Sequence, residues 1–226
     1  MEQFFFNLSI MLVPGLMAIT CHEVSHGYIA DKFGDNTARS MGRLTLNPIK
    51  HIDPIGLLML FIVKIGWAKP VPVNFNNLRH PKRDMIWVAA AGPITNFGLA
   101  LLSALAMRLL VHASAGIPLD SPLTAVVRPV VWNLAFSIYI NLILAIFNLI
   151  PLPPLDGGRV AVGLLPMRLS LLLSKVEPFG MIVIILVVVL IPRAFSFLIG
   201  PPVYFAIHLL AGPQSNLVFE VINLIT

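Results

Sequence analysis

Five consecutive residues near the start of the chain have the types and spacing of a metal site. His22 and His26 are four residues apart, and Glu23 follows the first histidine, so the segment matches H-E-x-x-H. On a helix this spacing places both imidazoles on one face, where they can share one zinc ion. Glu23 is then placed to act as the general base on the attacking water. The alternative is a polar trio that hydrogen-bonds to neighbouring helices or lies among lipid headgroups.

A catalytic zinc site needs a third protein ligand and leaves its fourth position open. Asp156 is the best candidate, because it is the only carboxylate between Asp120 and Glu177 and stands where a helix restarts after a proline-broken segment. Prolines keep that approach extended, and Gly157 and Gly158 allow the backbone to come close. From the residues alone, a ligand and an ordinary helix N-cap aspartate are about equally favoured. Weaker candidates are Cys21, His51, His80, His112 and His208.

The composition indicates that these residues lie in a membrane protein. Of the 226 residues, 58% are hydrophobic and only 11% are charged, whereas soluble domains average about 45–50% apolar and about 25% charged residues. Disorder is excluded by this hydrophobicity, and a nucleic-acid partner by the sparse basic residues. A single cysteine excludes a disulfide framework.

Long apolar segments must position the candidate site. The predicted fold class is an all-α polytopic membrane protein with about five to six transmembrane helices. A short apolar segment over Pro54–Ile65 suits a re-entrant element, because a dozen residues are too few to cross the bilayer. The predicted spans are Phe4–Ala30, Met85–Val111, Val130–Ile150, Pro178–Ile191 and Phe195–Ala211.

The distribution of charge predicts the orientation in the cell membrane. Between Asp31 and Asp84 there are nine basic residues, Lys64 among them, and four acidic residues. The resulting charge of +5 equals the net charge of the whole chain. By the positive-inside rule this region faces the cytoplasm, so His22 and His26 lie toward the cytoplasmic end of the first span.

Two segments in this polar region predict a small β-sheet at the membrane surface. Residues Arg43–Asn47 alternate with period two, as a strand does. In Trp67–Phe75, Pro70 and Pro72 lack N–H groups on one side, which confines this strand to a sheet edge. The edge could pair with an unwound substrate strand. We slightly favour the alternative, in which it is a structural clip between spans.

Five motifs in order resemble the site-2 protease family of intramembrane zinc metalloproteases. They lie between Cys21 and Arg159, over more than half of the chain, and an ordered set of this size is highly specific. The first is the H-E-x-x-H segment itself. The other four are Gly42–Pro48 with the following His51, Asp53, Pro54 and Gly56, then Trp67–Val73, Ala91–Asn96 and Asn148–Gly158.

The resemblance implies a function and a set of roles. Asp156 matches the third zinc ligand of the family, and Asn148 matches an asparagine that helps to hold substrate or the oxyanion. One zinc ion per chain is expected. Members of the family cut transmembrane segments of other proteins, so the partners are a membrane-spanning protein substrate and the lipid bilayer. Residues 1–226 would form one membrane-embedded metalloprotease domain, with a catalytic core at about 4–165 and C-terminal spans at about 174–212.

The chain has no PDZ insertion and begins almost directly at the motif-bearing span, so it resembles the compact bacterial and archaeal branch of the family. The alternative function is a non-catalytic zinc-binding membrane protein, either a transporter or a pseudoprotease. A transporter should carry more ionisable residues inside its spans, and a pseudoprotease should have lost Glu23. For Asn96 the family resemblance suggests a place near the site, and for His51 we prefer a structural role. We attribute Gly92 and Gly98 to close helix packing.

Overall fold

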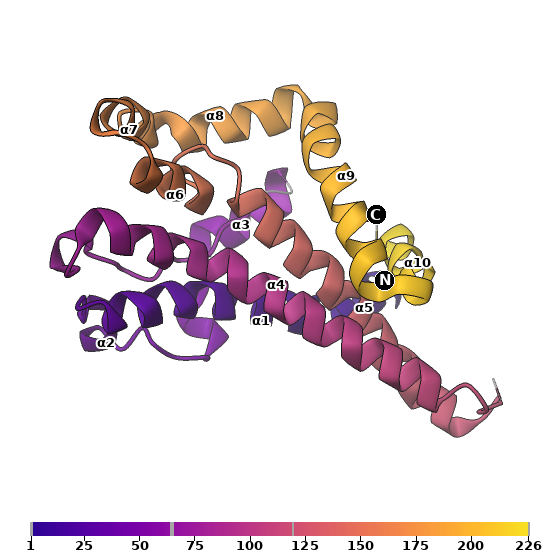
Figure 1. Cartoon of the computed structure of the whole chain (residues 1–226). Coiled ribbons are helices and arrows are strands. Elements are labelled where there is room, and N and C mark those ends of the chain that lie inside the picture. The colour runs from indigo at the N-terminus through magenta and orange to yellow at the C-terminus, as the bar shows by residue number, and fades with distance from the viewer. Residues whose placement is uncertain (1, 64–65, 119, 226) are drawn as a thin grey trace. The chain divides into compact units, whose positions relative to one another are not determined.

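The computed structural model describes residues 2–63, 66–118 and 120–225, and nearly all of its regular structure is helical (Figure 1). Lys64 and Ile65, at the end of the predicted re-entrant segment, lie outside the described residues. The elements are α1 (Glu2–Lys32), α2 (Thr37–Ser40), η1 (Pro48–His51), α3 (Pro54–Val63), η2 (Phe75–Asn77), α4 (Pro81–Ala113), α5 (Pro122–Asn148), α6 (Asp156–Leu164), α7 (Met167–Ser174), α8 (Glu177–Leu190), α9 (Pro192–Ala211), η3 (Gly212–Gln214) and α10 (Ser215–Ile225).

Four stretches of the described chain are helical, long and apolar enough to cross a bilayer. A fifth is present if α7 and α8, which are bent by 59° at a short break, count as one span. The lower bound of the predicted five to six spans is therefore reached only if this bent pair is one span, because α8 with 14 residues is too short to cross alone. The four stretches are Phe5–Lys32, Pro81–Ala113, Pro122–Asn148 and Ser196–Ile225.

The predicted β-sheet is wrong for the described residues. Arg43–Asn47 and Trp67–Phe75 form no strand, Phe75 begins the 3-10 helix η2, and one isolated antiparallel bridge joins Ile52 to Ala68. The physical reason is that side chains occupy the backbone groups that a sheet would use. The Arg43 guanidinium donates to the carbonyl oxygens of Lys69 and Pro70, at 2.9 and 3.3 Å.

The chain packs as two compact units. The first comprises Met1–Ala18, Asn96–Ile146 and Phe195–Thr226, and the second comprises Ile19–Thr95 and Phe147–Ala194. Helices α1 and α4 each contribute to both units. A single functional domain over residues 1–226 stays a prediction.

A chain of polar side chains joins three helices inside the first unit. The Asn96 amide on α4 donates to the Ala18 carbonyl on α1 at 3.2 Å and to Asn141 Oδ1 on α5 at 2.7 Å. Asn141 in turn donates to the Ser137 carbonyl at 2.9 Å. Both asparagines are almost completely buried. Asn96 thus bonds between helices, which the sequence analysis did not predict, because a buried amide in an apolar bundle must find partners.

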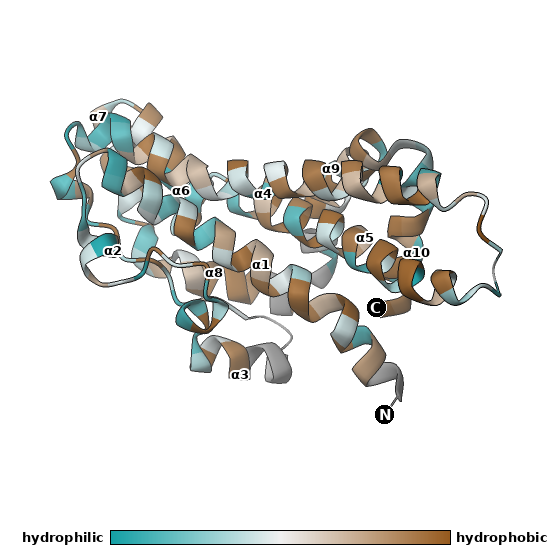
Figure 2. Cartoon of the chain, turned by 90° about the horizontal axis from the view of Figure 1, so that it is seen from below, coloured by the Kyte–Doolittle hydropathy of each residue, from teal (hydrophilic) through white to brown (hydrophobic). Residues whose placement is uncertain are grey.

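A buried carboxylate organises the polar end of the second unit. Figure 2 shows the long helices as mostly hydrophobic, with hydrophilic residues on α2. Asp35, which lies between α1 and α2, is fully buried. It accepts hydrogen bonds from the backbone N–H of Asn74 at 2.8 Å and the Asn77 amide at 3.0 Å, and from the Thr37 hydroxyl. These bonds tie the end of α1 to the loop that precedes α4.

Replacing Asp35 with alanine is expected to lower the free energy of unfolding by about 2–4 kcal/mol, because each hydrogen bond to a charged group contributes roughly 1.5–3 kcal/mol. Burial by itself raises the pKa of Asp35. The hydrogen bonds from Thr37, Asn77 and Asn74 lower it by more than burial raises it, so the pKa lies below its usual value. The stabilisation is then present above the unfolded pKa of about 3.9 and is lost as the pH falls through the folded value.

Thermal unfolding of the detergent-purified protein as a function of pH tests this prediction. The wild type should lose stability in acid more steeply than Asp35→Ala, whereas an exposed carboxylate, changed in Asp120→Ala, should alter neither the melting temperature nor its pH dependence. Equal acid sensitivity of wild type and Asp35→Ala would contradict the role of this carboxylate.

Candidate metal centre

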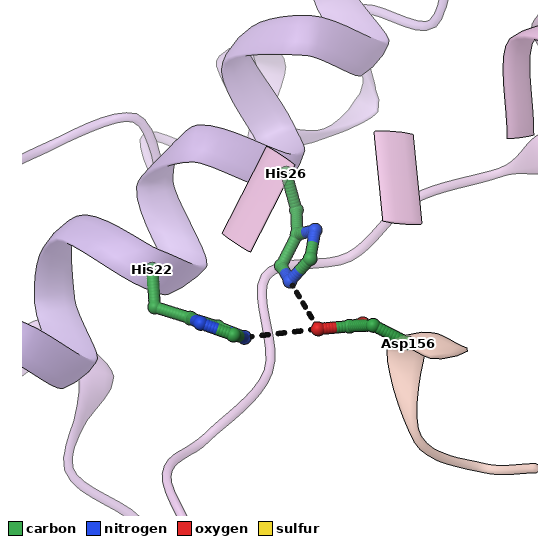
Figure 3. Close-up of side chains that lie close together, drawn as sticks. All are labelled: His22, His26 and Asp156. Atoms are coloured by element: carbon green, nitrogen blue, oxygen red, sulfur yellow. Dashed lines mark ion pairs between the residues drawn. The ribbon is translucent and has the colours of Figure 1, made fainter. Parts of the chain in front are cut away.

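The two histidines of the H-E-x-x-H segment lie on one face of α1, as their spacing predicts. Their ring centroids are 4.8 Å apart, and the ring planes are nearly perpendicular. His22 is buried with an exposed fraction of 7%. Figure 3 shows both rings extending from α1 toward the carboxylate of Asp156 at the start of α6. All three residues belong to the second compact unit.

Asp156 reaches the histidines because the chain folds back tightly before α6. A Cβ atom on Gly157 would overlap the Leu149 carbonyl, and one on Gly158 would overlap the backbone at Pro153. The prediction that these glycines allow close backbone approach is therefore confirmed. The N-cap of α6 is Leu155, and no side chain caps the helix. Asp156 thus does not serve as the N-cap, which was the alternative left open by its sequence.

Helix α6 is held against α4 at two points. A Cβ atom on Gly163 would overlap the side chain of Ile86, so the two helices are in close contact there. The Lys82 ammonium donates to the carbonyl oxygen of Leu165 at 2.7 Å, which satisfies a backbone acceptor at the end of α6. Both contacts lie at the C-terminal end of α6 and hold that end of the helix against α4.

A backbone carbonyl determines which nitrogen of His26 can bind a metal. His26 Nδ1 lies 2.7 Å from the carbonyl oxygen of Val88 on α4. A carbonyl only accepts, so Nδ1 carries the proton and donates it. In the neutral ring the lone pair is then on Nε2, the atom directed at Asp156 (Figure 3). Metal-binding histidines commonly have this arrangement, in which the second nitrogen is held by a carbonyl or carboxylate.

The donor set fits a zinc ion. Asp156 Oδ2 lies 3.1 Å from His22 Nε2 and 3.4 Å from His26 Nε2. Zinc bonds of about 2.0–2.1 Å in a tetrahedral arrangement separate ligand atoms by about 3.3 Å. Oδ2 is buried, and its nearest polar neighbours are the two imidazole nitrogens, as in a shared ligand set. Within the described residues, these three side chains make up the one cluster of His, Cys, Asp and Glu suited to a metal.

Comparison with known protein families gives a match over most of the chain. The model of the family described as Peptidase family M50 matches residues 10–191. The chain belongs to peptidase family M50. This is the site-2 protease family of zinc metalloproteases, so the chain is a zinc metalloprotease of a family of membrane proteins.

Individual relatives agree with this assignment. The M50 peptidase is 37% identical over 203 residues to the Bacillus subtilis protein named "Putative zinc metalloprotease YwhC", covering 84% of this chain and 86% of that protein. It is 31% identical over 199 residues to the Mycobacterium tuberculosis protein named "Putative zinc metalloprotease Rip2", covering 84% and 71% of the two chains. No solved structure gives a significant match.

The two predicted catalytic residues of the M50 peptidase lie on different helices. Glu23 lies beside the metal cluster on α1, and its Oε2 accepts a hydrogen bond of 2.9 Å from the backbone N–H of Val71. Asn148 is the last residue of α5, directly before Leu149, whose carbonyl faces Gly157. The chain thus returns toward α6 immediately after Asn148. The roles of both residues remain predictions.

The other histidines considered as third ligands lie elsewhere in this M50 peptidase. His51 is buried, and its Nε2 lies 2.8 Å from the carbonyl oxygen of Thr45, in keeping with the structural role preferred for it. His80 is exposed and lies 3.8 Å from Asp84. The ring of His208 packs near Phe219 with centroids 5.1 Å apart. Cys21, next to His22, is outside the three-residue cluster.

Gly92 is a site residue that the sequence did not reveal. Its packing partners are the metal-site histidines themselves. A Cβ atom at this position would lie 2.5 Å from His22 Cε1 and 2.6 Å from Nε2 of both His22 and His26. Glycine is therefore required to make room for the two imidazoles. Its place in the motif Ala91–Asn96 was a signal, but small residues in membrane helices usually indicate helix packing alone.

Replacing Gly92 with alanine is expected to weaken zinc binding by roughly 10- to 100-fold, the range seen when groups that orient metal ligands are altered. The added methyl group would overlap both imidazole rings. His26 has little room to move away, because its Nδ1 is bonded to the Val88 carbonyl. Zinc affinity measured by competition with a chelator checks this. Gly98→Ala is the matched control on α4, because a Cβ atom there meets nothing within 4 Å. Equal zinc affinity of the two variants would contradict the predicted crowding.

Proposed function

We propose that this M50 peptidase is an intramembrane protease that hydrolyses peptide bonds in or near transmembrane segments of membrane-protein substrates. The observation that carries the proposal is the position of the metal cluster within a candidate span. His22 and His26 precede Lys32, the last residue of α1, by about 15 and 9 Å along the helix. A site at this depth is buried within a hydrocarbon core about 30 Å thick. Substrates at this depth are themselves membrane-spanning.

The residues of the site have complementary roles in the proposed reaction. His22, His26 and Asp156 would hold zinc, which when bound supplies a Lewis acid and lowers the pKa of a water ligand toward about 7. Glu23 accepts the proton of the attacking water and passes it to the leaving amine. The Asn148 amide donates a hydrogen bond to the oxyanion that develops on the substrate carbonyl.

The proposed orientation places the site toward the cytoplasmic side of the cell membrane. The basic residues between α1 and α4 support it, because positively charged loops remain on the cytoplasmic side. One of these basic residues, Arg39, is neutralised locally by an ion pair with Asp31 at 2.6 Å. A membrane-spanning substrate must unwind locally at the site, because a helix hides its peptide groups from attack.

The proposal is tested by incubating the zinc-loaded protein in detergent with a panel of synthetic membrane-spanning peptides. Each peptide carries a central Gly-Pro pair that weakens its helix. Mass spectrometry should locate a cut inside the apolar segment, and removal of zinc with a chelator should abolish the cut, with restoration by added zinc. A cut confined to soluble flanking sequences would contradict intramembrane cleavage while leaving the metalloprotease assignment intact.

A further inference from the structure

An extended segment of the second unit is bonded directly to the candidate general base. This segment, Trp67–Val73, is called the strap here. The backbone N–H of Val71 donates to Glu23 Oε2 at 2.9 Å. The Val71 side chain is buried and would contact a Cβ atom on Gly27 at 2.7 Å. Since Glu23 and Gly27 are four residues apart, the strap lies along the face of α1 that carries Glu23.

The strap is held in this position by bonds on both sides of Val71. The backbone N–H of Lys69 donates to the His51 carbonyl at 2.9 Å. Arg43, itself buried, donates to the carbonyls of Lys69 and Pro70. Beyond the strap, the backbone N–H of Asn74 is bonded to Asp35 at 2.8 Å. The N–H of Val71 is thus a fixed donor, preorganised before any substrate binds.

Glu23 needs such a donor to act as a base. The helix fixes only its backbone, and three side-chain torsions leave the carboxylate free to turn away from His22. The bond from Val71 uses Oε2, and a carboxylate has a second oxygen that can accept a proton. Fixing one oxygen therefore orients the other, and misplacement of a reacting group by about 1 Å can cost on the order of 100-fold in rate.

We propose that the peptide N–H of Val71 is a positioning group, which holds Glu23 in the orientation required of the general base. This inference rests on the proposed function, in which Glu23 transfers the proton. It assigns the strap a part in the chemical step, in addition to joining the segments between α1 and α4. Displacement of the strap would then release the base from its working position.

The bond itself is tested without zinc and without substrate. In protein labelled with ¹⁵N-valine, the resonance missing from Val71→Ala identifies the Val71 amide. Its hydrogen exchange should accelerate at least about tenfold in Glu23→Ala, because the acceptor is gone. In Glu23→Gln the side-chain oxygen still accepts, so most of the protection should remain. An exchange rate unchanged in Glu23→Ala would overturn the inference.

The effect on the reaction is tested by a pair of variants at Val71. Val71→Pro replaces the N–H with a ring carbon, so it removes the donor and also crowds Glu23 Oε2, which lies 2.9 Å from the Val71 nitrogen. Val71→Ala removes a similar amount of packing but retains the N–H. We expect kcat on a cleaved peptide to fall roughly 10- to 100-fold in Val71→Pro, with KM and zinc content unchanged. Val71→Ala should lose clearly less kcat than Val71→Pro, since its donor is intact.

The outcomes separate the two proposals. If Val71→Pro and Val71→Ala lose kcat equally, or lose melting temperature and zinc content together, the strap is only a structural clip and the inference fails. If the wild type cuts no membrane-spanning peptide but the amide still depends on Glu23, the proposed function fails while the contact is confirmed. If kcat falls clearly more in Val71→Pro than in Val71→Ala, the result supports both the proposed function and the positioning role of the Val71 N–H.

Discussion

Zinc content is expected to fall from about one ion per chain to a small fraction of that when Asp156 is replaced with alanine, because two histidines alone are a poor zinc site. The carboxylate oxygen of Asp156 lies 3.1 and 3.4 Å from the two imidazole nitrogens. No other His, Cys, Asp or Glu among the described residues joins this cluster, so none is placed to substitute. Elemental analysis of the detergent-purified protein measures the change.

The matched control is Asp120→Ala, which removes the same carboxylate from an exposed loop position. It should retain the zinc content of the wild type. Zinc content near one ion per chain in Asp156→Ala, with affinity unchanged by competition against a chelator, would exclude Asp156 as the third ligand. Loss of zinc with an unchanged melting temperature of the zinc-free protein would separate metal binding from folding.

Replacing Glu23 with glutamine is expected to lower kcat by about 1,000-fold, because general acid–base catalysis typically contributes 10²–10⁴-fold. The amide has nearly the same shape and can still accept the hydrogen bond from Val71, so the fold and the strap should be retained. It cannot take up a proton from the attacking water. Zinc content should remain that of the wild type, since Glu23 lies outside the three-residue metal cluster.

Cleavage of the membrane-spanning peptides, followed as a time course at saturating substrate, measures this loss. Glu220→Gln, which changes an exposed glutamate on α10 in the other compact unit, is the control and should be fully active. Turnover by Glu23→Gln close to that of the wild type would remove Glu23 from the role of general base. Loss of zinc in the same variant would instead indicate that Glu23 supports the metal ligands.

The metal-binding face of α1 was predictable from local sequence, whereas the third ligand was not. The i, i+4 spacing of His22 and His26 has a fixed geometric meaning on any helix. Asp156 was selected by the scarcity of carboxylates and by family resemblance, and its residue type suited an N-cap equally well. The structure excludes the N-cap role, because Leu155 is the N-cap, and it places Asp156 Oδ2 beside both imidazoles. Its role as third ligand stays a prediction.

The two structural predictions that differ from the structure concern backbone pairing and helix bending. Period-two alternation in Arg43–Asn47 is not enough to make a strand, because a strand also needs a partner with free backbone groups. In the strap those groups are bonded to the side chains of Arg43 and Glu23. The number of spans depends on the 59° bend between α7 and α8. Hydropathy does not indicate such a bend, because both sides of it are apolar.

The sequence by itself determined the membrane setting, the long helices and the two histidines that can share a zinc ion. These properties depend on composition and on spacing within one element. Only the tertiary structure decided which backbone groups serve the site: the Val88 carbonyl at His26, the Val71 N–H at Glu23, and the space beside Gly92. The physical reason is that peptide groups are alike at nearly every position. Which peptide group contacts a distant side chain therefore depends on how the helices pack, and it cannot be predicted from residue types.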